Sequence, residues 1–233
     1  MVSDDASPPT RTTRPAVARR LVALAVLSAG GGLAFLPFLA AGSHEPISRV
    51  APFAAIVTVV ATVAAWPGLR CADAVGLRMP LLRRLDRVEP FSTIASRGIM
   101  VTLVVSAGLG GIGLAALRLI DAPPLPGGPT ARALSTLFAA GPLEVVLHLG
   151  IMSVVIWLAH GRRWIGILVA AVCLVGFHLT GGALQQPPRI IVATVLGNGT
   201  IGLALGWIYA AYGFECVVLG HAVAHLITVL GGA

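Results

Sequence analysis

The sequence has no lysine and few charged residues of any kind. Charged side chains make up 11% of its 233 residues, whereas a soluble domain carries about 25%. All 16 basic residues are arginine, against 9 Asp and Glu, for a formal net charge of +7. The arginines are spread between apolar runs rather than gathered in one patch. The charge therefore points to membrane topology, and we expect no nucleic-acid partner.

Cysteine is also scarce. Cys71, Cys173 and Cys216 lie far apart and form no Cys-x-x-Cys pair, which argues against a disulfide framework and against a thiolate zinc site. A serine nucleophile elbow, a phosphate-binding loop and a dinucleotide fingerprint are missing as well. The glycine clusters near 30 and 108–113 lack the strand–helix setting that would give them such a role.

Apolar residues are abundant, at 57% of the chain, and they recur in runs of about 20, the length that crosses a bilayer as a helix. The sequence predicts an all-α, polytopic transmembrane helical bundle of about seven spans. The expected spans are 21–42, 50–67, 98–119, 132–159, 164–182, 190–211 and 214–231. Between the second and third lies a polar stretch, 68–97, with a short interfacial helix near 81–88.

The arginines predict the orientation. Twelve fall on the side of the N-terminus in this arrangement, and four fall on the other side: Arg49, Arg118, Arg132 and Arg189. By the positive-inside rule the N-terminus is cytoplasmic. We expect residues 1–17 to be a disordered cytoplasmic segment and 18–233 to be one transmembrane domain in the plasma membrane, with lipid as its partner.

The fourth span contains two ionisable residues, Glu144 and His148. On a helix, residues four apart lie on one face. An acidic side chain at the centre of a membrane helix costs roughly 2.5–3.5 kcal/mol on insertion scales, so it faces the protein interior or a watery cavity and has a partner. Glu144 follows Pro142, and a helix that restarts there would favour the carboxylate through its N-terminal dipole.

Three more histidines lie in later apolar runs: His178, His221 and His225. The last two are spaced i, i+4, a spacing that metal sites also use. We expect these spans to bring Glu144 and the histidines together. The group offers two routes to amide hydrolysis. Glu144 can act as a general base toward water while histidines orient it or bind an oxyanion, or the same residues can hold a metal that activates the water.

Three segments of the sequence resemble the CAAX-protease and bacteriocin-processing (CPBP) intramembrane protease family. That family carries Glu-Glu-x-x-x-Arg, Phe-x-x-x-His and His-x-x-x-Asn or Asp on successive helices. The segment LEVVLHLGIMS (143–153) resembles the first, LVGFHLTG (174–181) the second and GFECVVLGHAVAHLI (213–227) the third. ADAVGLRMPLL (72–82) is similar to a cytoplasmic loop of bacterial members. The resemblance covers about 70–230, with the motif-bearing core at about 131–231.

The resemblance implies a membrane-embedded protease, of metallo- or glutamate type, that cleaves a membrane-associated protein or peptide. Carried over by position, Glu144 and His178 are the water-activating pair. His221 is the oxyanion or metal group, and His225 fills the position of its partner. If a metal is bound, the candidate is zinc, and the candidate ligands are Glu144, His148, His178, His221 and His225.

The chain departs from the motifs at four positions. Leu143 stands for the first glutamate, His148 for the arginine, Leu174 for the phenylalanine and His225 for the Asn or Asp. Two further interpretations follow. The protein could be a non-catalytic member that acts as a scaffold or a bacteriocin-immunity protein. It could also be a metal-binding membrane protein that uses its His and Glu residues.

Overall fold

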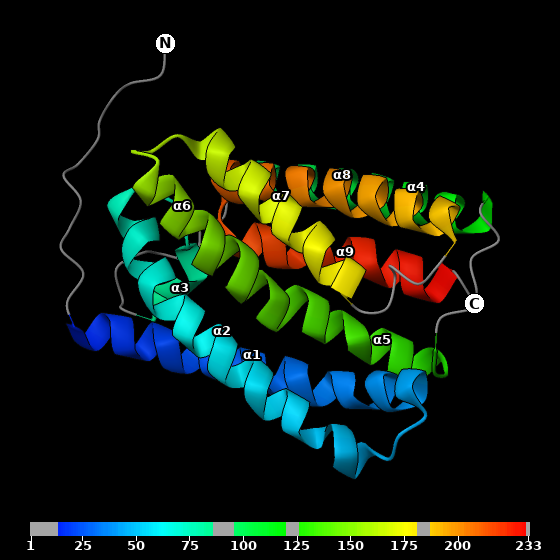
Figure 1. The fold of residues 1–233 in the computed structure, drawn as a ribbon. Helices are drawn as coiled ribbons and strands as arrows, with labels where there is room; N and C mark the ends of the chain where they lie inside the picture. The colour runs from blue at the N-terminus through cyan, green and yellow to red at the C-terminus, as the bar shows by residue number, and fades with distance from the viewer. Residues whose placement is uncertain (1–13, 86–95, 120–125, 181–186, 232–233) are drawn as a thin grey trace.

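The computed structural model describes residues 14–85, 96–119, 126–180 and 187–231, and the regular secondary structure in these ranges is helical (Figure 1). In chain order the helices are α1 (Arg14–Ser43), α2 (Ile47–Ala74), α3 (Pro80–Arg84), α4 (Ser96–Leu119), α5 (Pro129–Phe138), η2 (Ala139–Leu143), η3 (Val145–Met152), α6 (Ser153–Leu158), α7 (Arg163–Thr180), α8 (Pro188–Tyr212) and α9 (Phe214–Gly231). Most of the segment expected to be disordered lies outside the described residues, but α1 begins within it, at Arg14.

Seven helical stretches in these ranges are long and apolar enough to cross a membrane. They are Val17–Ser43, Ile47–Ala74, Gly98–Leu119, Pro129–Leu158, Arg163–Thr180, Pro188–Tyr212 and Phe214–Gly231. The prediction of an all-α, seven-span membrane protein is confirmed. Large apolar side chains such as Val104 and Leu196 stay exposed, as lipid-facing surfaces require.

The second span is longer than predicted. We expected it to end near 67, where Pro67 and Gly68 disfavour a helix, yet α2 runs through both to Ala74. Leu69 and Ala72 are fully buried in this extension. Their burial offsets the local preference, because packing commonly outweighs helix propensity.

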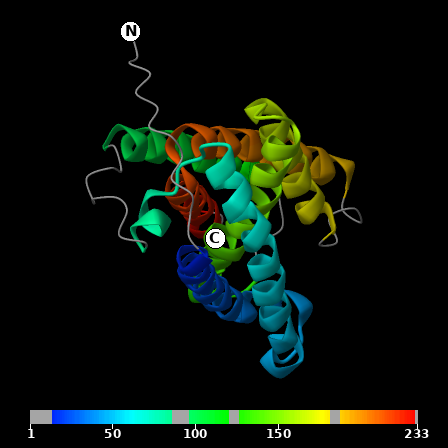
Figure 2. The same ribbon diagram turned by 90° about the vertical axis from the view of Figure 1, so that its left-hand side faces the viewer.

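The fourth span lies at the centre of the molecule. In its most apolar window 78% of the residues are buried, against 17–39% in the other six spans. Figure 1 shows it running between the α1–α2 pair on one side and the group of α4, α7, α8 and α9 on the other, and Figure 2 shows the same arrangement turned by 90°. Most polar side chains on this span are therefore buried: Arg132, Ser135, Thr136, Glu144, His148 and Ser153.

The fourth span also continues unbroken through Pro142. The chain is π-helical over Ala139–Leu143 and Val145–Met152, so Glu144 lies between two π-helical segments rather than at a new helix start. The expectation of a helix N-terminus at Glu144 is wrong. Proline normally kinks a helix because its ring clashes with the carbonyl of residue i−4, and the wider π-helical turn relieves that clash. Such segments often occur at functional sites.

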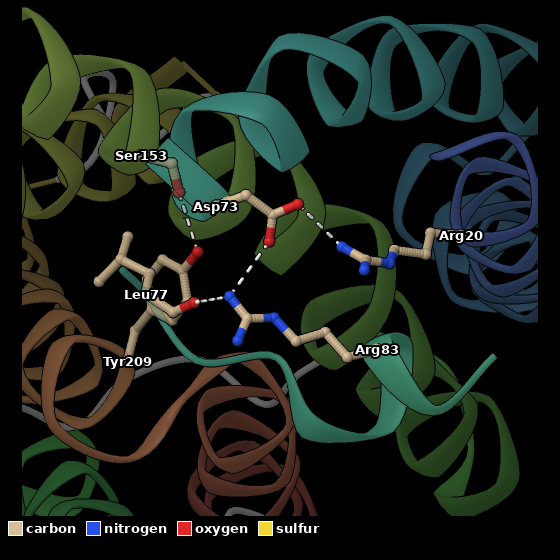
Figure 3. Close-up of polar contacts among 6 residues, drawn as sticks. All are labelled: Arg20, Asp73, Leu77, Arg83, Ser153 and Tyr209. Atoms are coloured by element: carbon tan, nitrogen blue, oxygen red, sulfur yellow. Dashed lines mark hydrogen bonds and ion pairs between the residues drawn. The ribbon is translucent and has the colours of Figure 1, made fainter. Parts of the chain in front are cut away.

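An ion cluster closes the end of the bundle that carries most arginines. Asp73 at the end of α2 accepts from Arg20 of α1 at 3.0 Å and from Arg83 of α3 at 3.2 Å (Figure 3). Arg83 also donates to the carbonyl of Leu77 at 3.4 Å. On the other side of α3, the Leu82 N–H donates to Glu215 at the start of α9 at 3.0 Å. These bonds tie α2 and α9 to α3, and the Arg20–Asp73 pair ties α1 to α2.

Candidate functional site

Glu144 is fully buried, and each of its carboxylate oxygens contacts an imidazole. Oε1 lies 2.5 Å from Nδ1 of His221 on α9, and Oε2 contacts Nδ1 of His148, one turn along the same span. His148 is also fully buried, while His221 keeps 5% exposure. The structure therefore brings the acid together with one histidine of its own span and with one from a helix 77 positions away.

The contact with His221 assigns the hydrogen on that ring. A carboxylate can only accept, so Nδ1 of His221 carries the hydrogen and donates it, which leaves Nε2 of the neutral ring with a lone pair. Oε2 of Glu144 lies against Nδ1 of His148 as an ion-pair contact. Among the described residues, neither Oε2 nor either ring nitrogen of His148 has a partner in hydrogen-bond geometry.

Ser153 and Tyr209 both contact His148, one through its backbone carbonyl and the other through its ring. The Ser153 hydroxyl donates to the His148 carbonyl at 3.3 Å and lies 2.9 Å from the Tyr209 hydroxyl (Figure 3). The Tyr209 ring packs edge-on against the His148 ring, with centroids 6.3 Å apart. Sequence reasoning missed both residues. The available signal was a serine and a tyrosine in otherwise apolar helices.

His225 lies one turn beyond His221 on α9, with the two ring centroids 6.2 Å apart. Its Nδ1 is 3.2 Å from the hydroxyl of Thr136 on α5. When the hydroxyl donates, Nε2 of His225 carries the ring hydrogen and is a donor. Thr136 is 6% exposed and was not among the predicted site residues. Its partner on another helix could not be read from the sequence.

His178 lies at the periphery of this group. Its Nδ1 donates to the Leu174 carbonyl, one turn back on α7, at 2.9 Å. The ring is close enough to His221 and His225 for electrostatic interaction with both. It also packs edge-on against Phe177. His178 is not a hydrogen-bond partner of Glu144 in the described part of the chain. Both oxygens of that carboxylate face His148 and His221 instead.

The donor atoms do not converge as metal ligands would. Nδ1 of His148 and Nδ1 of His221 each point at an oxygen of Glu144, so these atoms face one another rather than a shared centre. Within the described ranges, no group of three or more His, Cys, Asp or Glu is placed to hold a metal ion. The arrangement fits a hydrogen-bonded carboxylate–imidazole cluster, and zinc stays a prediction of the sequence.

Fold and site together define a multi-pass membrane protein with a buried carboxylate–imidazole cluster on its central span. We compared the chain with models of known protein families, with curated protein sequences and with solved structures. None of the three comparisons returned a match. The cluster and the motif resemblance are therefore the two features from which a function can be inferred.

Proposed function

We propose that this protein is an intramembrane endopeptidase of the CPBP type, which hydrolyses a peptide bond of a membrane-associated protein or peptide. The observation that supports this most is the buried Glu144 carboxylate with an imidazole Nδ1 on each oxygen. An acid that accepts from Nδ1 fixes the tautomer of the ring and makes Nε2 a better base, as in catalytic triads.

His221 is the better candidate for the general base, because it keeps some exposure whereas His148 keeps none. Its Nε2 takes a proton from water as the water oxygen bonds to the scissile carbonyl carbon. Glu144 stabilises the imidazolium that forms. The ring then returns the proton to the amide nitrogen as the C–N bond breaks, and the products are a carboxylic acid and an amine.

His225 is suited to stabilise the oxyanion of the tetrahedral intermediate. Thr136 can fix its tautomer so that Nε2 carries the hydrogen, and the ring lies one turn from His221. A donor already in place where negative charge develops contributes to the rate without further reorganisation. His148 contributes differently: as second donor to Glu144, it replaces the hydration that the buried carboxylate has lost.

A second candidate is a non-catalytic family member that acts as a scaffold or immunity protein. It is favoured by the closure of the cluster, since Glu144 and His148 have no solvent exposure. In that case the cluster serves to join the central span to α9. The same substitutions then lower stability but leave the biological effect of the folded protein unchanged.

The test compares the peptide termini in membranes from cells that express wild-type protein, Glu144→Gln or His221→Asn. The protease proposal expects new termini with wild type and with a control variant, and none with Glu144→Gln or His221→Asn. Glu45→Gln is the control, because Glu45 is an acid at the surface, paired with Arg49. Termini that are identical in all four membranes, with all four proteins folded, would reject proteolysis. Elemental analysis of the purified protein tests zinc separately: stoichiometric metal would mean that a metal ion, and not His221, activates the water.

A further inference from the structure

Arg132 is a buried cation with no acidic partner in the described part of the chain. The residue keeps 8% exposure. Among the described residues its Nε has no hydrogen-bond partner, and no acidic side chain forms an ion pair with it. An arginine stays charged in proteins, and burying an uncompensated charge is expensive. Arg132 has no role in the Glu144 cluster, so its burial calls for a separate explanation.

The helix that carries Arg132 begins with an open N-terminus. α5 starts at Pro129, directly after Gly128, with no side-chain cap from the described residues and no acidic residue in its first turn. Gly128, Pro129 and Thr130 are exposed. A helix start has free N–H groups and a partial positive charge, which together favour an anion. Side chains on a helix lean toward its N-terminus, so we expect the side chain of Arg132 to add its positive charge near that helix start.

The position of Arg132 relative to the bilayer indicates which anion the site would bind. Arg132 lies three residues inside a span that begins at Pro129, at the end of the bundle where α8 begins and α9 ends (Figure 1). Phospholipid phosphates are concentrated at that level of a bilayer, and basic residues between transmembrane helices bind such headgroups. Phosphate also matches a guanidinium in charge and in geometry.

We propose that the start of α5 is a phosphate-binding site, formed by the guanidinium of Arg132 and the free N–H groups of the first turn. The phosphate is that of a phospholipid in the adjacent leaflet, and inorganic phosphate is the soluble source of the same chemistry. This site is independent of the protease proposal, because it shares no residue with the Glu144 cluster.

The experiment counts phospholipid on the detergent-purified full chain by native mass spectrometry, after addition of phosphatidylglycerol or of inorganic phosphate. The variants are Arg132→Met and Arg132→Gln. Arg189→Gln is the matched control, since Arg189 follows the first proline of α8 at the same end but is exposed. We expect one retained phospholipid on wild type and on Arg189→Gln. Affinity should fall by about tenfold or more without Arg132, the equivalent of one charge-assisted hydrogen bond.

Thermal melting gives a second readout with a distinctive sign. Without added phosphate, Arg132→Met should melt at or above the wild-type temperature, because the substitution removes a buried charge that no acid balances. Phosphatidylglycerol should then raise the melting temperature of wild type and of Arg189→Gln, but not of the two Arg132 variants. An equal rise with inorganic phosphate would identify a soluble anion as the ligand. Equal lipid retention by wild type and both Arg132 variants would overturn the proposal.

The wild-type protein alone also tests the site, should both Arg132 variants fail to fold. A wild-type chain that retains no phospholipid and melts at the same temperature with and without either phosphate source has no such site.

Discussion

Nδ1 of His221 lies 2.5 Å from Oε1 of Glu144, although 77 positions separate the two residues in the sequence. The contact joins α9 to the central span inside the membrane region, where lipid offers polar groups no water for hydrogen bonding. Nδ1 of His148 contacts the other carboxylate oxygen, Oε2. The three side chains therefore depend on one another, and substitutions at each should have separable effects.

Replacing Glu144 with Gln should lower both activity and stability. The amide has only one acceptor oxygen, so the Nδ1–H of either His148 or His221 loses its partner unless that ring changes tautomer. An unsatisfied buried donor costs about 1–3 kcal/mol. Differential scanning fluorimetry in detergent measures the loss, and Glu45→Gln, at an exposed pair, should melt like wild type. A Glu144→Gln protein as stable as wild type would mean that the carboxylate does not hold the two rings.

Asparagine at positions 148 and 221 should separate two roles of these histidines: hydrogen bonding to the Glu144 carboxylate and catalysis. Its amide N–H can occupy the place of a histidine Nδ1–H but provides nothing at Nε2. We expect His148→Asn to retain most stability and part of the activity. His221→Asn should retain stability but lose cleavage entirely, because the general base is gone. Cleavage that persists in His221→Asn would move the base to another residue, with His148 and His178 as the next candidates.

The Ser153–Tyr209 pair should behave as a coupled unit. Ser153→Ala leaves the Tyr209 hydroxyl buried without this partner, at a cost of about 1–3 kcal/mol, whereas Tyr209→Phe leaves Ser153 its bond to the His148 carbonyl. Ser153→Ala combined with Tyr209→Phe should therefore cost less than the sum of the two single substitutions. A double-mutant cycle on the free energy of unfolding measures this coupling. Strict additivity would show that the 2.9 Å contact between the hydroxyls contributes nothing to stability.

The Asp73 ion cluster should contribute more to the free energy of unfolding than an exposed ion pair does. Asp73→Asn removes an acidic partner of Arg20, which is only 3% exposed, and of Arg83. We expect a loss of about 2–3 kcal/mol, below the range for a fully buried pair, because Asp73 keeps 18% exposure. Arg49→Gln, which breaks the exposed pair with Glu45, should leave the melting temperature almost unchanged. Equal effects of the two substitutions would show that burial does not strengthen the Asp73 cluster.

The sequence by itself determined the spans. Their number and approximate positions follow from local hydropathy, because a run of apolar residues has few alternatives to crossing the bilayer as a helix. It also marked Glu144, His148, His178, His221 and His225 as unusual, since ionisable groups inside such runs are expensive. Each of these inferences needs only neighbours in the chain.

Only the tertiary structure decided which groups meet. Helix rotation and packing direct Glu144 to His148 and His221, pair Thr136 with His225 and bury Arg132. Those outcomes depend on contacts between spans far apart in the sequence, which no local pattern encodes. Packing also carried α2 past Pro67 and the central span through Pro142, where the energy of burial outweighed the local preference of proline.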